Sequence, residues 1–246
     1  MSNQLVALLA VLILGVAVLY SVVGHAGASG YLAVMGLLGV APLVMKPTAL
    51  VLNIFVAVVT STKFYRAGHF SFRLFWPFAL ASVPFAFLGG ALTLPSHWYK
   101  VAVGVLLLYS AVQMFFTRRA IAEKALTQPP LPFALAIGSV IGLVSGLIGV
   151  GGGIFLSPIL LLAGWAGVRE AAAVSALFIL VNSIAALLGH VTAVAGLPSV
   201  LPVFVVAAVT GGWIGASYGS RRLPPTALRQ ALALVLVIAG VKLILV

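Results

Sequence analysis

The chain has 246 residues, of which 63% are hydrophobic and only 6% are charged, with 13 lysines and arginines against two acidic residues. Soluble domains carry about 25% charged residues, so this composition excludes a soluble globular protein. It also excludes nucleic acid as the reason for the net charge of +11, because the basic residues lie between apolar segments, where they anchor helices at lipid headgroups. The absence of cysteine, with so few acidic residues and four histidines, leaves too few ligands for a metal centre, and no cofactor is expected.

Apolar runs separated by basic and turn-forming residues predict ten helices. A membrane-spanning helix needs about 20 mostly apolar residues, and continuous runs favour helices over the short alternating strands of a barrel. We therefore predict an all-α polytopic membrane protein with about 8–10 membrane segments. The expected helices, in chain order, cover residues 4–23, 30–41, 47–65, 72–93, 98–117, 131–148, 153–165, 170–190, 199–219 and 226–246.

A polar segment at 118–130, which ends in two prolines, divides the chain near its middle. The parts on either side, 1–117 and 131–246, match each other in order. Matching positions, spaced by 123 or 129 residues, include Lys46 and Arg169, Val51 and Val174, Thr60 and Ser183, and Lys100 and Arg229. We therefore predict an internal duplication, with a first transmembrane repeat, a linker and a second transmembrane repeat.

The basic residues predict that the two repeats have opposite orientations in the membrane. The connection around 63–73 is basic and its counterpart around 189–198 has no lysine or arginine, whereas the bias reverses between 94–100 and 221–229. Basic loops stay in the cytoplasm, so equivalent loops lie on opposite sides, as inverted repeats require. The linker at 118–130 then lies in the cytoplasm and both termini lie outside.

Two glycine-rich segments interrupt the apolar helices at corresponding places. Residues 145–158 hold five glycines within eight positions, and glycine costs about 1 kcal/mol relative to alanine in a helix interior. Residues 24–30 form the matching break in the first repeat. Opened backbone at membrane depth is tolerated only inside protein or beside a wet cavity, and the N–H groups of a new helix near Ile154 suit an anion. We predict two half-helix N-termini that meet around an anion near the midplane.

The substrate-binding residues are expected at the two breaks and on the helices beside them. His25 is either a proton-coupling group or a neutral imidazole that binds a freed carbonyl, whereas His69, His97 and His190 are expected at the membrane interface. Thr60 and Ser183 are stronger candidates because they occupy equivalent positions in the two repeats. Asn53 and Asn182 are further sources of polar contacts. The expected substrate-binding set is His25, Gly27, Ser29, Gly30, Thr60, Gly151, Gly152, Gly153, Ser157 and Ser183.

The element Gly-Leu-Ile-Gly-Val-Gly-Gly-Gly-Ile-Phe-Leu-Ser-Pro-Ile-Leu at 146–160, in a duplicated chain of this length, resembles the sulfite exporter TauE/SafE family. The resemblance implies an exporter or carrier of small sulfur-containing anions, such as sulfite or organosulfonates, in bacterial inner membranes. Family members usually carry a similar triple-glycine element in the first repeat. This chain instead has Gly-His-Ala-Gly-Ala-Ser-Gly at 24–30, a departure that bears on the identity of the substrate more than on transport.

We therefore expect a secondary transporter, not an enzyme, that works by alternating access, since the sequence has no Gly-x-x-x-x-Gly-Lys-Ser/Thr motif for ATP. Two alternatives stay open. An anion channel would use the same site if both gates opened together. A rhomboid-like intramembrane serine protease would use Gly-x-Ser-Gly at 27–30 with His190 as base, although this leaves the second break unexplained. The coupling ion, with protons as the candidate, and the formation of homo-oligomers are open as well.

Overall fold

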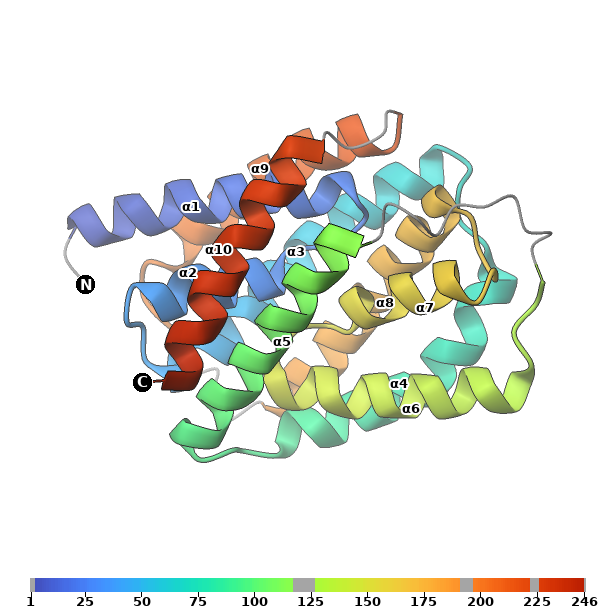
Figure 1. Cartoon of the computed structure of the whole chain (residues 1–246), viewed down its shortest axis with the longest axis horizontal. Coiled ribbons are helices and arrows are strands. Elements are labelled where there is room, and N and C mark those ends of the chain that lie inside the picture. Colours follow the sequence, from blue (N-terminus) through green and yellow to red (C-terminus); the bar gives the residue numbers. More distant parts are fainter. Residues whose placement is uncertain (1–2, 117–126, 191–196, 222–225, 246) are drawn as a thin grey trace.

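The computed structural model describes residues 3–116, 127–190, 197–221 and 226–245, which form ten α-helices (Figure 1). In the first half these are α1 (Asn3–Val22), α2 (Ala28–Leu37), α3 (Pro42–Arg66), α4 (Phe72–Ala91) and α5 (Ser96–Phe116). In the second half they are α6 (Leu131–Ile148), α7 (Gly153–Leu162), α8 (Val168–Gly189), α9 (Leu201–Gly219) and α10 (Thr226–Leu245). Of the expected linker at 118–130, only residues 127–130 fall within the described ranges.

Six of the described helices, namely α1, α3, α4, α6, α8 and α9, are long and apolar enough to cross a membrane. The prediction of an all-α polytopic membrane protein is thereby confirmed. α2 and α7 have only ten residues each, which is about 15 Å of helix against a hydrocarbon core of about 30 Å. They are too short to cross, and each follows directly on one of the glycine breaks.

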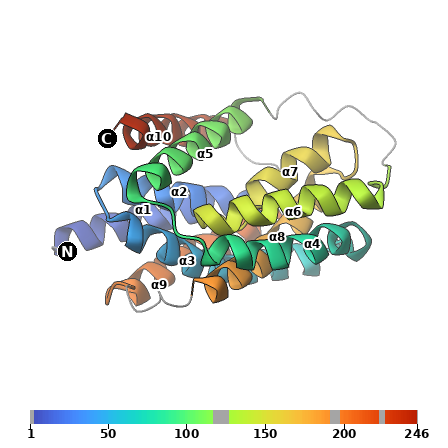
Figure 2. The same cartoon turned by 90° about the horizontal axis from the view of Figure 1, so that it is seen from below.

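The most extensive helix contacts all join the first half of the chain to the second. α4 packs against α6 and α8, and in the same way α9 packs against α1 and α3. α5 packs against α10. Figure 2 shows α5 and α10 side by side on one face of the molecule. The two halves are therefore interlocked and do not form separate bundles.

The packing divides eight of the helices into two units that each contain helices of both halves. A hydrophobic cluster of its own joins α4, α6, α7 and α8, which we term the second unit. The corresponding helices α1, α2, α3 and α9, the first unit, share a larger cluster with α5 and α10. Ile148, Val150, Ile154 and Ile179, at the second break and on α8, also join this larger cluster. α3 and α8 contact each other where the two units meet.

Glycines let the long helices of each unit approach to backbone contact. On α6 and α9 they recur every four residues, and a side chain at any of them would collide with a carbonyl oxygen of the facing helix. The facing pairs are Gly138 with Phe78, Gly142 with Ser82, Gly146 with Ala86, Gly211 with Leu14, Gly215 with Val18 and Gly219 with Val22. Small residues at such spacing are the usual basis of close helix packing in membranes.

Replacing Gly142 by alanine is expected to destabilise the protein, because the new Cβ meets the backbone of α4 at Ser82 and the two helices must separate. Overpacking of this kind costs about 1–3 kcal/mol. The matched control is Gly15→Ala on α1, where a Cβ meets nothing within 4 Å and helix propensity favours alanine by about 1 kcal/mol. Thermal unfolding in detergent should show a lower melting temperature for Gly142→Ala and a higher one for Gly15→Ala. Equal changes in melting temperature would contradict this account of the α4–α6 contact.

One helix begins earlier than the sequence indicates, and this changes the place of a charged residue. α3 starts at Pro42, which occupies the first turn where a proline N–H is not needed, and continues through Pro47. The expected start at 47 was therefore wrong. Lys46, which was expected in a connection, lies inside α3 and is only 5% exposed.

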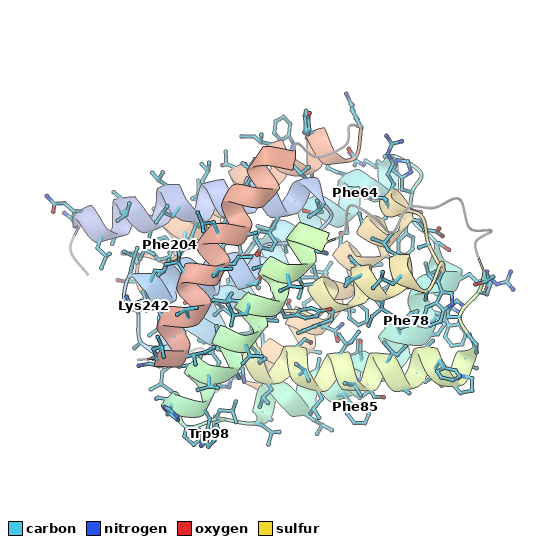
Figure 3. All side chains as sticks on the ribbon, in the orientation of Figure 1. Phe64, Phe78, Phe85, Trp98, Phe204 and Lys242 are labelled. Carbon is cyan, nitrogen blue, oxygen red and sulfur yellow. The ribbon has the colours of Figure 1, made fainter. Side chains whose placement is uncertain are left out.

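α1 begins and α10 ends at the same end of the molecule, whereas α6 begins at the opposite end (Figure 1). Figure 3 shows Trp98 and Lys242 at the end near both termini, with Phe64 and Phe78 toward the other. Trp98 is 62% exposed, as an aromatic side chain at the level of the lipid headgroups would be. The end that holds Trp98 and both termini is called the terminal end below.

Candidate functional site

The first glycine break is the connection between α1 and α2. Gly24 and Gly27 have left-handed backbone, with φ of +82° and +108°. The Tyr31 hydroxyl donates to the Ala26 carbonyl at 2.7 Å, which satisfies an acceptor that the broken helix leaves free. The break thus keeps its opened backbone buried without losing hydrogen bonds there.

The second break, between α6 and α7, is held by a side chain of the first unit. Asn53 on α3 donates from Nδ2 to the Val150 carbonyl at 3.0 Å and lies 3.5 Å from Ser183 Oγ on α8. Gly151 lies beside both side chains, since a Cβ there would come within 2.6 Å of Ser183 Oγ and 3.1 Å of Asn53 Nδ2. Asn53 and Ser183 are both fully buried.

The backbones of the two breaks correspond at a spacing of 125, except at Gly151, which is left-handed although its counterpart Ala26 is not. α2 and α7 are equally long, and in each case the N–H after the left-handed glycine bonds back to the last turn of the preceding helix at 3.0 Å, from His25 to Tyr20 and from Val150 to Ser145. The left-handed glycines pair as Gly24 with Gly149, Gly27 with Gly152 and Gly39 with Gly164. The two breaks therefore align at a spacing of 125 residues.

A side-chain contact joins the two breaks directly. Ser157 in α7 donates to Ser175 Oγ on α8 at 2.7 Å, and the Nε2 of His25 lies 2.9 Å from Ser157 Oγ. Because the Ser157 proton is directed at Ser175, the His25 ring donates to Ser157 in this arrangement. His25 belongs to the first unit and both serines to the second, so this chain crosses the boundary between the units.

The short helices both present uncapped N-termini. Gly27 and Gly152 are their N-cap residues, and neither helix has a side-chain hydrogen bond at its cap. The first N–H groups of each helix, at Ala28 and Ser29 and at Gly153 and Ile154, are the positive ends of the helix dipoles. Such ends bind anions, and no acidic side chain of the described residues belongs to either break.

The structure brings part of the expected site together and sets part of it apart. His25, Ser157, Gly151, Gly153 and Ser183 gather where the second break meets α8, since Gly153 lies against the backbone of Ser175. The other expected residues contact their own unit or the packed core: Ser29 with Tyr20 at 2.7 Å, Gly30 with Val16, Gly27 with Tyr31, Thr60 with Ser21 at 3.4 Å, and Gly152 with Ile141 and Phe178.

The sequence reasoning missed one residue at this site, whereas Asn53 and Asn182 were expected as sources of polar contacts. Ser175 was not considered, although a serine on an apolar helix two turns before Ser183 marks the same face. The amide oxygens of Asn53 and Asn182 are buried and have no hydrogen-bond partner within the described ranges. Buried polar atoms are usually paired, so these oxygens can accept from a ligand that carries O–H or N–H.

Comparison with known proteins agrees with this architecture. The model of the family described as Sulfite exporter TauE/SafE matches residues 8–243. The chain belongs to the TauE/SafE family. A relative from Sinorhizobium fredii (strain NBRC 101917 / NGR234), named probable membrane transporter protein y4hK, is 42% identical over 241 residues, which cover 96% of this chain and 97% of the relative. No solved structure matches the chain.

As a TauE/SafE member, the protein is a multi-pass bacterial membrane transporter and not an enzyme. The protease alternative is also wrong on geometry. Ser29 is hydrogen-bonded to Tyr20, whereas His190, the base that this reading requires, follows the last residue of α8, whose end packs against the end of α4. His190 lies at the end of α8, as expected, and is only 7% exposed.

Proposed function

We propose that the protein is a secondary transporter that exports a small sulfur-containing anion, such as sulfite or an organosulfonate. The observation that carries this proposal is the His25–Ser157 contact, which joins the two glycine breaks and their uncapped helix N-termini. The anion would bind between the breaks, with helix N–H groups and the hydroxyls of Ser157 and Ser183 as donors. Transfer of the anion from water to this buried site removes its hydration shell, and these donors replace the hydrogen bonds that the anion loses.

The movement we propose is alternating access, with the first unit rocking against the second around the bound anion. The interlocked packing favours these mixed units over the two sequence halves as the moving bodies. Two hydrogen bonds connect the units, one between His25 and Ser157 and one between Asn53 and Val150. An anion that changes either bond would therefore couple its binding to the movement of the units. Inverted repeats related in the membrane plane are the usual basis of such movement, and His25 is the proposed carrier of a coupling proton.

The first test is binding of anions to the purified protein in detergent, followed by thermal unfolding. A ligand that binds only the native state at 100 times its Kd stabilises by about 2.7 kcal/mol, so a selective rise in melting temperature is expected with one of sulfite, sulfoacetate, taurine or thiosulfate. Sulfate and chloride serve as comparison anions. No selective rise with any sulfur anion would contradict the proposed substrate class.

Transport in proteoliposomes then separates a carrier from a channel. A carrier exchanges external labelled anion for internal unlabelled anion, so internal substrate should accelerate uptake. A channel gives a conductance that internal substrate does not accelerate. Conductance without exchange would overturn alternating access and favour the anion channel.

A further inference from the structure

Lys46 is a buried cation that the proposed anion site does not use. It lies near the start of α3, is 5% exposed, and donates from Nζ to the carbonyl oxygens of Gly90 at 3.1 Å and Leu92 at 3.2 Å. These carbonyls end α4, where a helix has unpaired acceptors and the negative end of its dipole. The contact crosses from the first unit to the second, as the contacts at the glycine breaks do.

A second basic side chain reaches the same place from another helix. His190 follows the last residue of α8 and is 7% exposed. The end of α8 lies directly against the end of α4, because a Cβ at Gly189 would collide with the backbone of Phe87 and Ala91. Lys46 and His190 therefore share the end of α4, and we term this pair with its carbonyls the basic cluster.

The positive charge of the basic cluster is not balanced by a carboxylate in the described part of the chain. Glu170, the acidic residue within those ranges, lies in the first turn of α8, whereas His190 caps the last turn of that helix. Carbonyl oxygens supply only partial negative charge, and burying a cation without full compensation is costly. The Lys46 ammonium has three donors, of which two are used by Gly90 and Leu92.

The basic cluster adjoins the second glycine break. A Cβ at Gly149 would lie 2.9 Å from Lys46 Cγ, and the Tyr99 hydroxyl donates to the Ile148 carbonyl just before it. The same region holds the end of α4 and the start of α5, which lie at the terminal end with Trp98 (Figure 3). Lys46 therefore lies between the second break and the end of α4 at the terminal end.

We infer that Lys46 and His190 form a second binding station for the transported oxyanion, between the glycine breaks and the terminal end. This inference rests on the proposed function. When the anion arrives, its oxygens accept from the Lys46 ammonium and the His190 ring in place of, or in addition to, the carbonyls of α4. The exchange loosens a contact between the two units and thereby favours opening toward the terminal end.

The test compares two lysines that both cap a helix end. Lys242 donates to the Leu37 carbonyl at the end of α2 but lies exposed on α10, so Lys242→Met removes a cap without removing a buried charge. Exchange of sulfoacetate and of isethionate, which carry two and one negative charges, is measured in proteoliposomes with the whole chain. Lys46→Met should raise the half-saturating concentration of sulfoacetate at least tenfold and that of isethionate less, whereas Lys242→Met should leave both unchanged.

Two further variants keep the test decisive if Lys46→Met folds poorly. His190→Gln keeps an N–H donor but cannot take up a charge, and it should raise the half-saturating concentration of sulfoacetate severalfold. Lys46→Arg keeps the charge and should restore most of the affinity. Wild-type half-saturating concentrations in both Lys46→Met and His190→Gln would overturn the second station and leave the proposed function standing. Failure of the wild-type chain to exchange any sulfur anion would instead overturn the proposed function.

Discussion

Replacing His25 by leucine is expected to lower anion transport at least tenfold while the protein stays folded. Leucine fills a similar volume, but it removes the donor that joins the first break to Ser157. As the proposed proton carrier, His25 is protonated in part of the cycle, and a hydrogen bond that involves a charged group contributes about 1.5–3 kcal/mol, which corresponds to about ten- to hundredfold in affinity. The measurement is anion exchange in proteoliposomes, with the melting temperature of each variant as the check on folding.

The control for this prediction is His97→Leu, because His97 lies exposed in the first turn of α5 and should tolerate the change. A double-mutant cycle with Ser157→Ala isolates the pair. If His25 and Ser157 act together, the double variant should be little worse than either single variant. Fully additive losses would show that the two side chains serve the anion independently, contrary to the proposal.

His25→Gln separates binding from proton coupling. Glutamine keeps an N–H donor but does not titrate in the physiological range. We expect it to support exchange of anion for anion and to fail in uptake driven by a pH gradient. Gradient-driven transport at the wild-type rate in this variant would exclude His25 as the proton carrier.

The ten helices and both breaks could be predicted from the sequence because each depends on local chemistry. Long apolar runs have few alternatives to helix in a membrane, and the glycines at 149–153 mark the second break without any knowledge of the fold. α7 begins at Gly153, where the expected helix over 153–165 also begins. The His25–Ser157 contact joins two residues that the sequence had placed in one site, although nothing local required them to touch.

The pairing of the helices and the contacts of individual side chains depend on tertiary packing, which local sequence patterns do not predict. The sequence shows matching halves, but only the structure shows that α4 pairs with α6 and α9 with α1. Lys46 looks like an interfacial charge until α3 is seen to begin at Pro42 and to carry it beneath the end of α4. Ser29 and Thr60 fit the site by type and spacing, yet each is bonded to a side chain of α1.

Replacing Gly152 by alanine is expected to cause a large loss of stability. Gly152 has φ of +83°, a conformation that costs a residue with a side chain about 1–2 kcal/mol. A Cβ there also meets Ile141 Cγ2 at 2.8 Å and Phe178 at 2.9 Å, and overpacking adds about 1–3 kcal/mol. Together these terms predict a loss of about 2–5 kcal/mol, measured by thermal or denaturant unfolding in detergent.

Gly39 provides the control that separates the two causes. Its φ is +73°, but a Cβ there meets nothing within 4 Å, so Gly39→Ala should lose only the backbone term of about 1–2 kcal/mol. The difference between the variants then measures how tightly the N-terminus of α7 is wedged between α6 and α8. A tight wedge is what a fixed anion site requires, because donors that shift with each ligand cannot discriminate among anions. Equal losses at Gly39 and Gly152 would mean that the break is loosely packed, and the N–H groups of α7 would then be poor candidates for a preorganised site.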